Sequence, residues 1–111
     1  MIRPAMSAAA AALLRALIAR AGVPRDRILL TDVQSADWQS LTLNGERHQI
    51  GLRVPGPDCA DIVERMCDGL EDAEFRIPGV IVADIGLMGT PQRSIDGSAR
   101  LTIEALTVAE D

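Results

Sequence analysis

Few residues of this 111-residue chain could carry out acid–base, nucleophilic or metal chemistry. His48 is the single histidine, so any general base or metal centre that uses an imidazole must use it. It stands between Arg47 and Gln49, and no cysteine, serine elbow or HxxE-type partner lies near it in the sequence. We therefore expect a strand histidine with a structural hydrogen bond, rather than a catalytic or metal-binding group.

A pair of aspartates is the next candidate. Asp32 and Asp84 follow similar, mostly aliphatic runs, 29–31 and 81–83, and could form a symmetric carboxylate pair. Each also stands where an apolar strand becomes polar, which is the usual place for a solvated aspartate, and this interpretation is favoured. The alternative hypothesis is a ligand-binding or enzymatic domain that uses Asp32, Asp84 and His48.

The two cysteines, Cys59 and Cys67, lie eight residues apart in one predicted helix. Their Cα atoms would be separated by about 12 Å along the axis, whereas a disulfide needs about 7 Å or less. Without a nearby histidine they also do not form a metal site, and no glycine-rich phosphate loop is present. We expect two buried free thiols, which are compatible with the cytoplasm. We also expect no cofactor and no metal.

Both aspartates belong to a near-repeat with an offset of 52 residues. The dipeptide Asn44-Gly45 returns as Asp96-Gly97. Apolar residues of the first helix, Leu14 and Ile18, return as Met66 and Leu70. The repeat predicts a single domain built from two helix-plus-hairpin halves, about 5–54 and 57–109.

Two helices are predicted. The first runs from Ser7 to Ala21, with Ser7 as N-cap and Gly22 ending it. The second begins after Asp58 as N-cap and has an apolar stripe at 62, 63, 66 and 70. The residues after it are acidic, which is the wrong sign for a helix C-terminus. A solvated acidic face is favoured, and an arginine-bearing partner surface is the alternative.

Period-two patterns predict the strands. The dipeptide Asn44-Gly45 predicts a two-residue hairpin turn, which would place Leu41, Leu43, Ile50, Leu52 and Val54 on one half-buried face. A strand from Pro78 to Met88, a long turn over 89–97 and a last strand over 99–108 follow. The order α-β-β-α-β-β predicts an α+β fold of permuted ferredoxin-like type, with a four-stranded antiparallel sheet and two helices on one face.

Net charge and hydrophobicity exclude further classes of function. The formal net charge of −5 and the scattered arginines disfavour sequence-specific nucleic-acid binding, and no stretch is apolar enough for a membrane span. Because both helices are predicted to cover one face of the sheet, partners are expected at the uncovered face or at a sheet edge. Trp38 could anchor an interface or fill the core. The predicted interaction residues are Trp38, Arg47, His48, Glu71, Asp72, Gln92 and Arg93.

Several segments together suggest a family. After the first helix come 45–54 (GERHQIGLRV), a second helix ending near Leu70, Pro78-Gly79-Val80, and Asp96-Gly97 leading into 100–107 (RLTIEALT). This order resembles the small tail-component proteins of long-tailed phages and gene transfer agents, of the tail-terminator type, over almost the whole chain.

The resemblance implies a structural protein that is not an enzyme. Such a protein forms a ring, commonly sixfold, which caps the tail tube and joins it to the head connector. The implied partners are further copies of itself and tail-tube or connector proteins, with no membrane. It would be cytoplasmic during assembly and then part of the particle tail. A dimeric interaction module that pairs through its open sheet face remains a further alternative.

Overall fold

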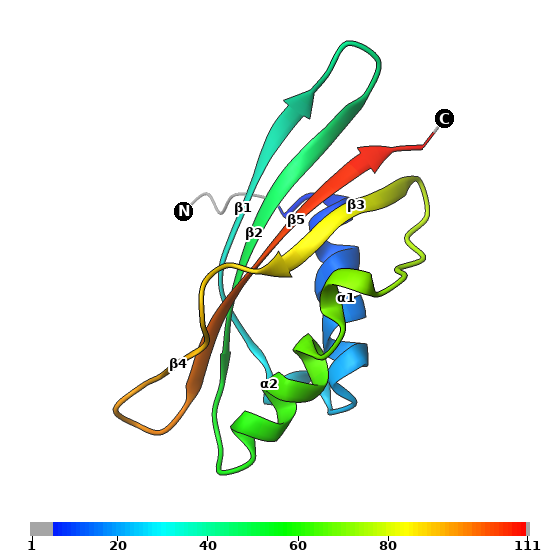
Figure 1. Ribbon diagram of the computed structural model, residues 1–111. Helices are drawn as coiled ribbons and strands as arrows, with labels where there is room; N and C mark the ends of the chain where they lie inside the picture. Colours follow the sequence, from blue (N-terminus) through cyan, green and yellow to red (C-terminus); the bar gives the residue numbers. More distant parts are fainter. Residues whose placement is uncertain (1–5, 111) are drawn as a thin grey trace.

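The computed structural model describes residues 6–110 as two helices packed on an antiparallel sheet (Figure 1). In chain order the elements are α1 (Ala8–Ala21), β1 (Leu29–Gln39), β2 (Asn44–Val54), α2 (Cys59–Cys67), β3 (Val80–Leu87), β4 (Gln92–Arg93) and β5 (Ala99–Ala109), with single 3-10 turns η1 (Arg25–Arg27) and η2 (Leu70–Asp72). The strand order is β1-β2-β5-β3, and β4 pairs with β5 beyond the end of β3.

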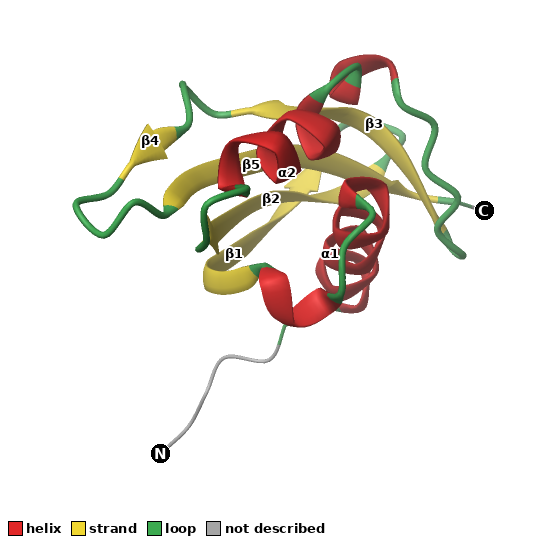
Figure 2. Ribbon diagram, turned by 90° about the horizontal axis from the view of Figure 1, so that it is seen from below, coloured by secondary structure: helices red, strands yellow, loops and turns green. Residues whose placement is uncertain are grey.

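Both helices lie on one face of the sheet (Figure 2), which confirms the predicted α+β fold. The core between them contains Leu13 and Leu17 of α1, Met66 of α2, and Ile50 and Ile103 of the sheet. The segment 89–97, expected to be one long turn, contains the short strand β4. No helix within residues 6–110 has both the length and the apolar character needed to cross a membrane.

The ends of α1 are as predicted. The Ser7 hydroxyl accepts a hydrogen bond from the Ala10 N–H at 3.1 Å, which satisfies one of the free donors of the first turn. Gly22 ends the helix with a φ of 70° and donates its N–H to the Ala19 carbonyl. This left-handed conformation favours glycine.

The ends of α2 are held by arginines, which corrects the predicted cap. Asp58 stands at the N-cap but makes no side-chain capping bond, because its carboxylate pairs with the Arg27 guanidinium. At the other end Arg20 of α1 donates from Nε to the Met66 carbonyl at 2.9 Å, and also to the Asp68 carbonyl. A cation at these carbonyls offsets the acidic residues that follow the helix.

The register of the first hairpin differs from the prediction. Gln39 pairs with Asn44 and Trp38 with Gly45, so the turn is formed by residues 40–43 and the dipeptide lies inside β2. Neither Asn44 nor Gly45 has the positive φ that a type I′ turn requires. The predicted burial of Leu41 and Leu43 is therefore wrong, since both are exposed.

Gly45 is needed for close strand packing instead of for a turn. A Cβ at this position would overlap the Thr107 carbonyl oxygen of β5 and would lie 3.1 Å from the Val108 Cα. Glycine inside a strand often marks such a close approach of another backbone. The dipeptide Asn44-Gly45 does lie in a hairpin, as predicted. Its glycine is required by packing against β5, and not by the conformation of the turn.

The two outer strands carry equivalent β-bulges. The register of β1 against β2 shifts between Leu30 and Asp32, and that of β3 against β5 shifts between Val82 and Asp84. The two shifts are 52 residues apart, which is the offset of the sequence repeat. Each aspartate therefore follows a bulge on an edge strand.

Candidate interaction site

His48 is a buried structural residue. Its side chain is 1% exposed, its Nδ1 is 2.7 Å from the Ser35 hydroxyl, and its Nε2 is 2.9 Å from the Thr107 hydroxyl. Ser35, His48 and Thr107 belong to β1, β2 and β5, and their side chains lie on the sheet face that the helices cover. Burial lowers the pKa of His48, so the neutral ring has one donor and one acceptor nitrogen for the two hydroxyls. The predicted strand histidine with a structural hydrogen bond is confirmed.

The residues of the enzymatic alternative do not converge. Asp32 and Asp84 lie on the two opposite edge strands, three interstrand spacings or about 14 Å apart across the sheet, and the register separates them further along the strands. Their register places both on the face opposite to His48. Ser35 and His48 resemble a nucleophile and its base, but the third group is the neutral hydroxyl of Thr107. Within residues 6–110, no three acidic, histidine or cysteine side chains are grouped to hold a metal ion.

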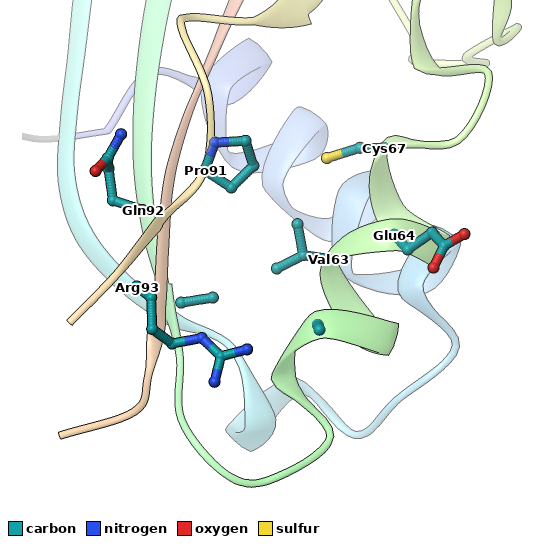
Figure 3. Close-up of a pocket in the computed structure, with 8 residues that line it drawn as sticks. Val63, Glu64, Cys67, Pro91, Gln92 and Arg93 are labelled. Atoms are coloured by element: carbon teal, nitrogen blue, oxygen red, sulfur yellow. The ribbon is translucent and has the colours of Figure 1, made fainter. Parts of the chain in front are cut away.

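The α2–β4 pocket is an open, mainly apolar hollow of about 350 Å³ between α2 and the segment around β4 (Figure 3). Its lining residues are Ala60, Val63, Glu64, Cys67, Pro91, Gln92, Arg93 and Ala99. Val63 and Cys67 point from α2 toward Pro91 on the opposite wall. The Cys67 thiol is half-buried and its pKa is raised by burial, so it stays protonated near neutral pH. The prediction of a buried thiol is confirmed fully only for Cys59.

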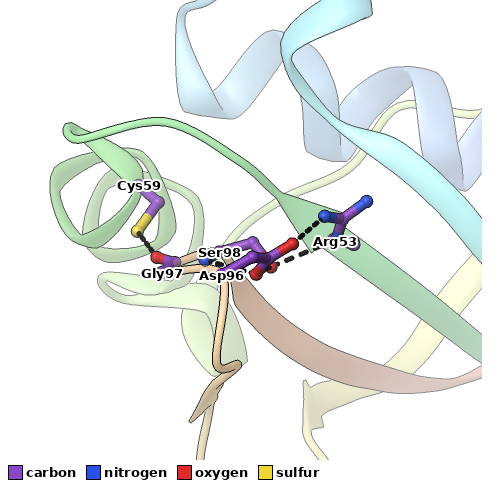
Figure 4. Close-up of polar contacts among 5 residues, drawn as sticks. All are labelled: Arg53, Cys59, Asp96, Gly97 and Ser98. Atoms are coloured by element: carbon purple, nitrogen blue, oxygen red, sulfur yellow. Dashed lines mark hydrogen bonds and ion pairs between the residues drawn. The ribbon is translucent and has the colours of Figure 1, made fainter.

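A polar network holds the turn between β4 and β5 (Figure 4). Asp96 accepts hydrogen bonds from the Ser98 N–H at 3.0 Å and the Ser98 hydroxyl at 2.6 Å, and it pairs with Arg53 of β2. These donors lower the pKa of Asp96 to about 2, with Ser98 as the larger cause. The Cys59 thiol donates to the Gly97 carbonyl at 3.4 Å and so connects the turn to α2. The end of the predicted long turn over 89–97 is therefore held by contacts within the chain.

The hairpin tip, residues 40–43, lies at the opposite end of the molecule from the α2–β4 pocket (Figure 1). It projects past the ends of β3 and β5. Leu41 is 104% exposed and Leu43 is 45% exposed. Ser40 closes the tip, because its N–H donates to the Leu43 carbonyl at 2.9 Å and its hydroxyl accepts from the Leu43 N–H at 3.1 Å.

The uncovered sheet face is mostly polar and has one apolar row near the tip. The register aligns Trp38, Gly45, Val108 and Ile81 across β1, β2, β5 and β3. Gly45 contributes no side chain to this row, in which the indole of Trp38 is half-buried. Trp38 is not part of the core beneath the helices, so its alternative role as a core-filling residue is wrong.

The seven predicted interaction residues fall into four places. Trp38 and Arg47 lie on the uncovered face of the first hairpin, and His48 is buried on the other face. Glu71 and Asp72 are exposed in η2, beside β3. Gln92 and Arg93 line the α2–β4 pocket. Sequence reasoning missed Leu41, Leu43 and Cys67, because the assumed register buried the first two and the helix prediction buried the third.

Comparison with known proteins gives one informative likeness. No family model matches the chain, and no curated protein matches it. Among solved structures, a chain in the virion of a native gene transfer agent (GTA) particle has a similar fold, with a TM-score of 0.54 and 16% sequence identity. The alignment covers 89% of this chain and 85% of that chain. The architecture described above is therefore shared with a chain of that particle.

Proposed function

We propose that this chain is a structural, non-enzymatic subunit of a phage-like particle, and that it acts as a tail terminator. The observation that carries the proposal is the fold shared with a chain of a gene transfer agent virion over almost the full length of both chains. The resemblance of 45–54 and 100–107 to tail-terminator proteins supports the same assignment. In this role the subunits form a ring that caps the tail tube and joins it to the head connector.

The distribution of surfaces supports assembly into a ring. A cyclic ring needs two different complementary patches on each subunit. This chain has an apolar hairpin tip at one end and an apolar pocket at the other. The net charge of −5 also suits a ring through which DNA passes, because an acidic surface does not retain the phosphate backbone.

Deletion of the gene in a particle-producing strain tests this proposal. We expect tails of uncontrolled length, or heads and tails that are not joined, when the particles are examined by electron microscopy. The wild-type gene supplied from a plasmid should restore normal particles. Normal particles in the deletion strain would contradict the proposed role.

A further inference from the structure

We propose that the hairpin tip of one copy inserts Leu41 and Leu43 into the α2–β4 pocket of the next copy. The inference rests on the proposed function in one respect, since it takes the neighbour in the ring to be a second copy of this chain. It assigns the two surfaces of the ring contact, which the proposed function leaves open.

The tip is shaped for insertion before it meets a partner. Ser40 makes two hydrogen bonds to the backbone of Leu43, which closes the loop in a defined conformation. Leu41 is completely exposed as a result. A loop that is already ordered loses little conformational freedom on binding, so its apolar contacts stabilise the complex more effectively.

The pocket has matching size and character. Val63, Cys67 and Pro91 give it apolar walls, and its volume is about 350 Å³. At ~30 Å³ for each carbon, comparable to one water molecule, the eight side-chain carbons of two leucines need roughly 240 Å³. The volume is therefore sufficient for both side chains, and the contact would remove exposed apolar surface from water on both partners.

The two surfaces can meet only between copies. The tip and the pocket lie at opposite ends of the molecule (Figure 1), whose longest dimension is 46 Å. A contact between different patches on two identical subunits is heterologous, and successive copies then follow in a head-to-tail series. Such a series forms a closed ring when the rotation between neighbours closes.

The charges beside the tip complement those beside the pocket. Asp37 and Glu46 pair across the hairpin on one of its faces, and Arg47 lies on the other face. The pocket has Arg93 on its β4 wall and Glu64 on its α2 wall. A hairpin that enters with its acidic face toward Arg93 brings Arg47 toward Glu64. The reverse orientation would place like charges together, so the charges also select the orientation.

The native Cys67 thiol allows a direct test by disulfide trapping. Leu41→Cys places a second thiol on the tip without disturbing the core, since Leu41 is fully exposed. Under oxidation, two Cβ atoms brought close enough allow a disulfide between position 41 of one copy and Cys67 of the next. We expect a reducible ladder of dimers and higher species on a denaturing gel, because each copy carries both thiols.

Two controls make the result specific. The double variant Leu41→Cys with Cys67→Ser should give no ladder. Ile95→Cys, at a position that is 109% exposed in the other turn, should give little product because this side chain is not on the tip. Circular dichroism should show that all three variants remain folded.

Three outcomes would overturn the proposal. The first is no ladder with Leu41→Cys at high protein concentration, since oxidation accumulates even a weak contact. The second is a product that persists after Cys67→Ser, which means that the thiol at position 41 reacts with a thiol other than Cys67. The third is equal cross-linking of Ile95→Cys. A ladder combined with normal particles in the deletion strain would support this contact and reject the role in the particle. Tail defects without a ladder would support the role in the particle and reject this contact.

Discussion

The two hairpins of this protein carry related turn dipeptides, Asn44-Gly45 and Asp96-Gly97, but the dipeptides occupy different structural positions. Gly97 lies in a genuine turn with a φ of 87° and no atom within 4 Å of where a Cβ would be. Gly45 lies inside β2 against the backbone of β5. One glycine is required by backbone conformation and the other by close packing.

The difference between the two hairpins shows how two halves with related sequences form unlike ends of the molecule. Equivalent bulges precede Asp32 and Asp84, so the framework of the two hairpins is similar. The first hairpin continues without interruption to the exposed tip. The second is interrupted after Leu87, and the separate strand β4 then forms one wall of the α2–β4 pocket. The proposed contact surfaces lie where the halves differ.

The largest expected effect comes from Gly45→Ala, compared with Gly97→Ala. The first substitution forces β2 away from β5 and should lower the free energy of unfolding by about 3 kcal/mol or more. The second adds only backbone strain, at about 1–2 kcal/mol. Urea denaturation of both variants measures the difference. Equal losses would show that the two glycines have the same role after all.

The next comparison is His48→Ala with Arg100→Ala, at positions that are 52 residues apart in the sequence but lie on opposite faces of the sheet. Loss of the His48 ring leaves a cavity and a buried Thr107 hydroxyl without its partner, at a cost of roughly 2–4 kcal/mol. Arg100 is exposed, so its substitution should change stability by less than about 0.5 kcal/mol. Thermal or urea unfolding at pH 7.5 provides the measurement. A cost for His48→Ala as small as that for Arg100→Ala would contradict the structural role.

The same histidine gives a pH dependence. Because the pKa of folded His48 is lowered, the unfolded state binds more protons below its own pKa of about 6.5. Stability is therefore complete above pH 6.5 and falls as the pH drops from there toward the folded pKa. Urea midpoints between pH 8 and pH 5 should fall for the wild type and change less for His48→Ala. Identical pH profiles for the wild type and His48→Ala would contradict the assignment of this pH dependence to His48.

A smaller effect at lower pH is expected from Asp96→Asn, which makes the second dipeptide identical to the first. The pKa of Asp96 is lowered to about 2, so its carboxylate stabilises the fold above about pH 4 and this contribution is lost as the pH falls toward 2. The variant should lack that part of the acid-induced loss. An acid-unfolding curve unchanged by the substitution would show that Ser98 and Arg53 do not hold this turn.

The smallest effect on stability is expected from Leu41→Ser. The side chain is fully exposed, so the free energy of unfolding should change by less than about 0.5 kcal/mol. Assembly should nevertheless fail, because the tip loses its main apolar group. Complementation of the deletion strain with this variant checks the separation of stability from assembly. Full complementation would assign the contact to other residues.

Much of the fold could be predicted from the sequence because its signals were local. The cap at Ser7, the stop at Gly22 and the helix-strand order depend on neighbours in the chain. The hairpin register could not be predicted, since Gly45 is required by Thr107 of β5, 62 residues away in the sequence. The capping of α2 by Arg20 is equally non-local.

The candidate site was predicted only in part for the same reason. Gln92 and Arg93 belong to the predicted long turn over 89–97, and the structure places them beside Cys67 and Val63 in one pocket. Pattern reasoning could not bring α2 and β4 together, because their association depends on the sheet order. Leu41 was missed because exposure at a turn is decided by the register.

Electron cryomicroscopy of purified particles would test the central claim most directly. We predict that this fold occupies one end of the tail tube as a closed ring, in which the hairpin tip of each copy lies in the α2–β4 pocket of its neighbour. Density for the chain elsewhere in the particle, or particles that lack it altogether, would contradict the proposed tail-terminator role.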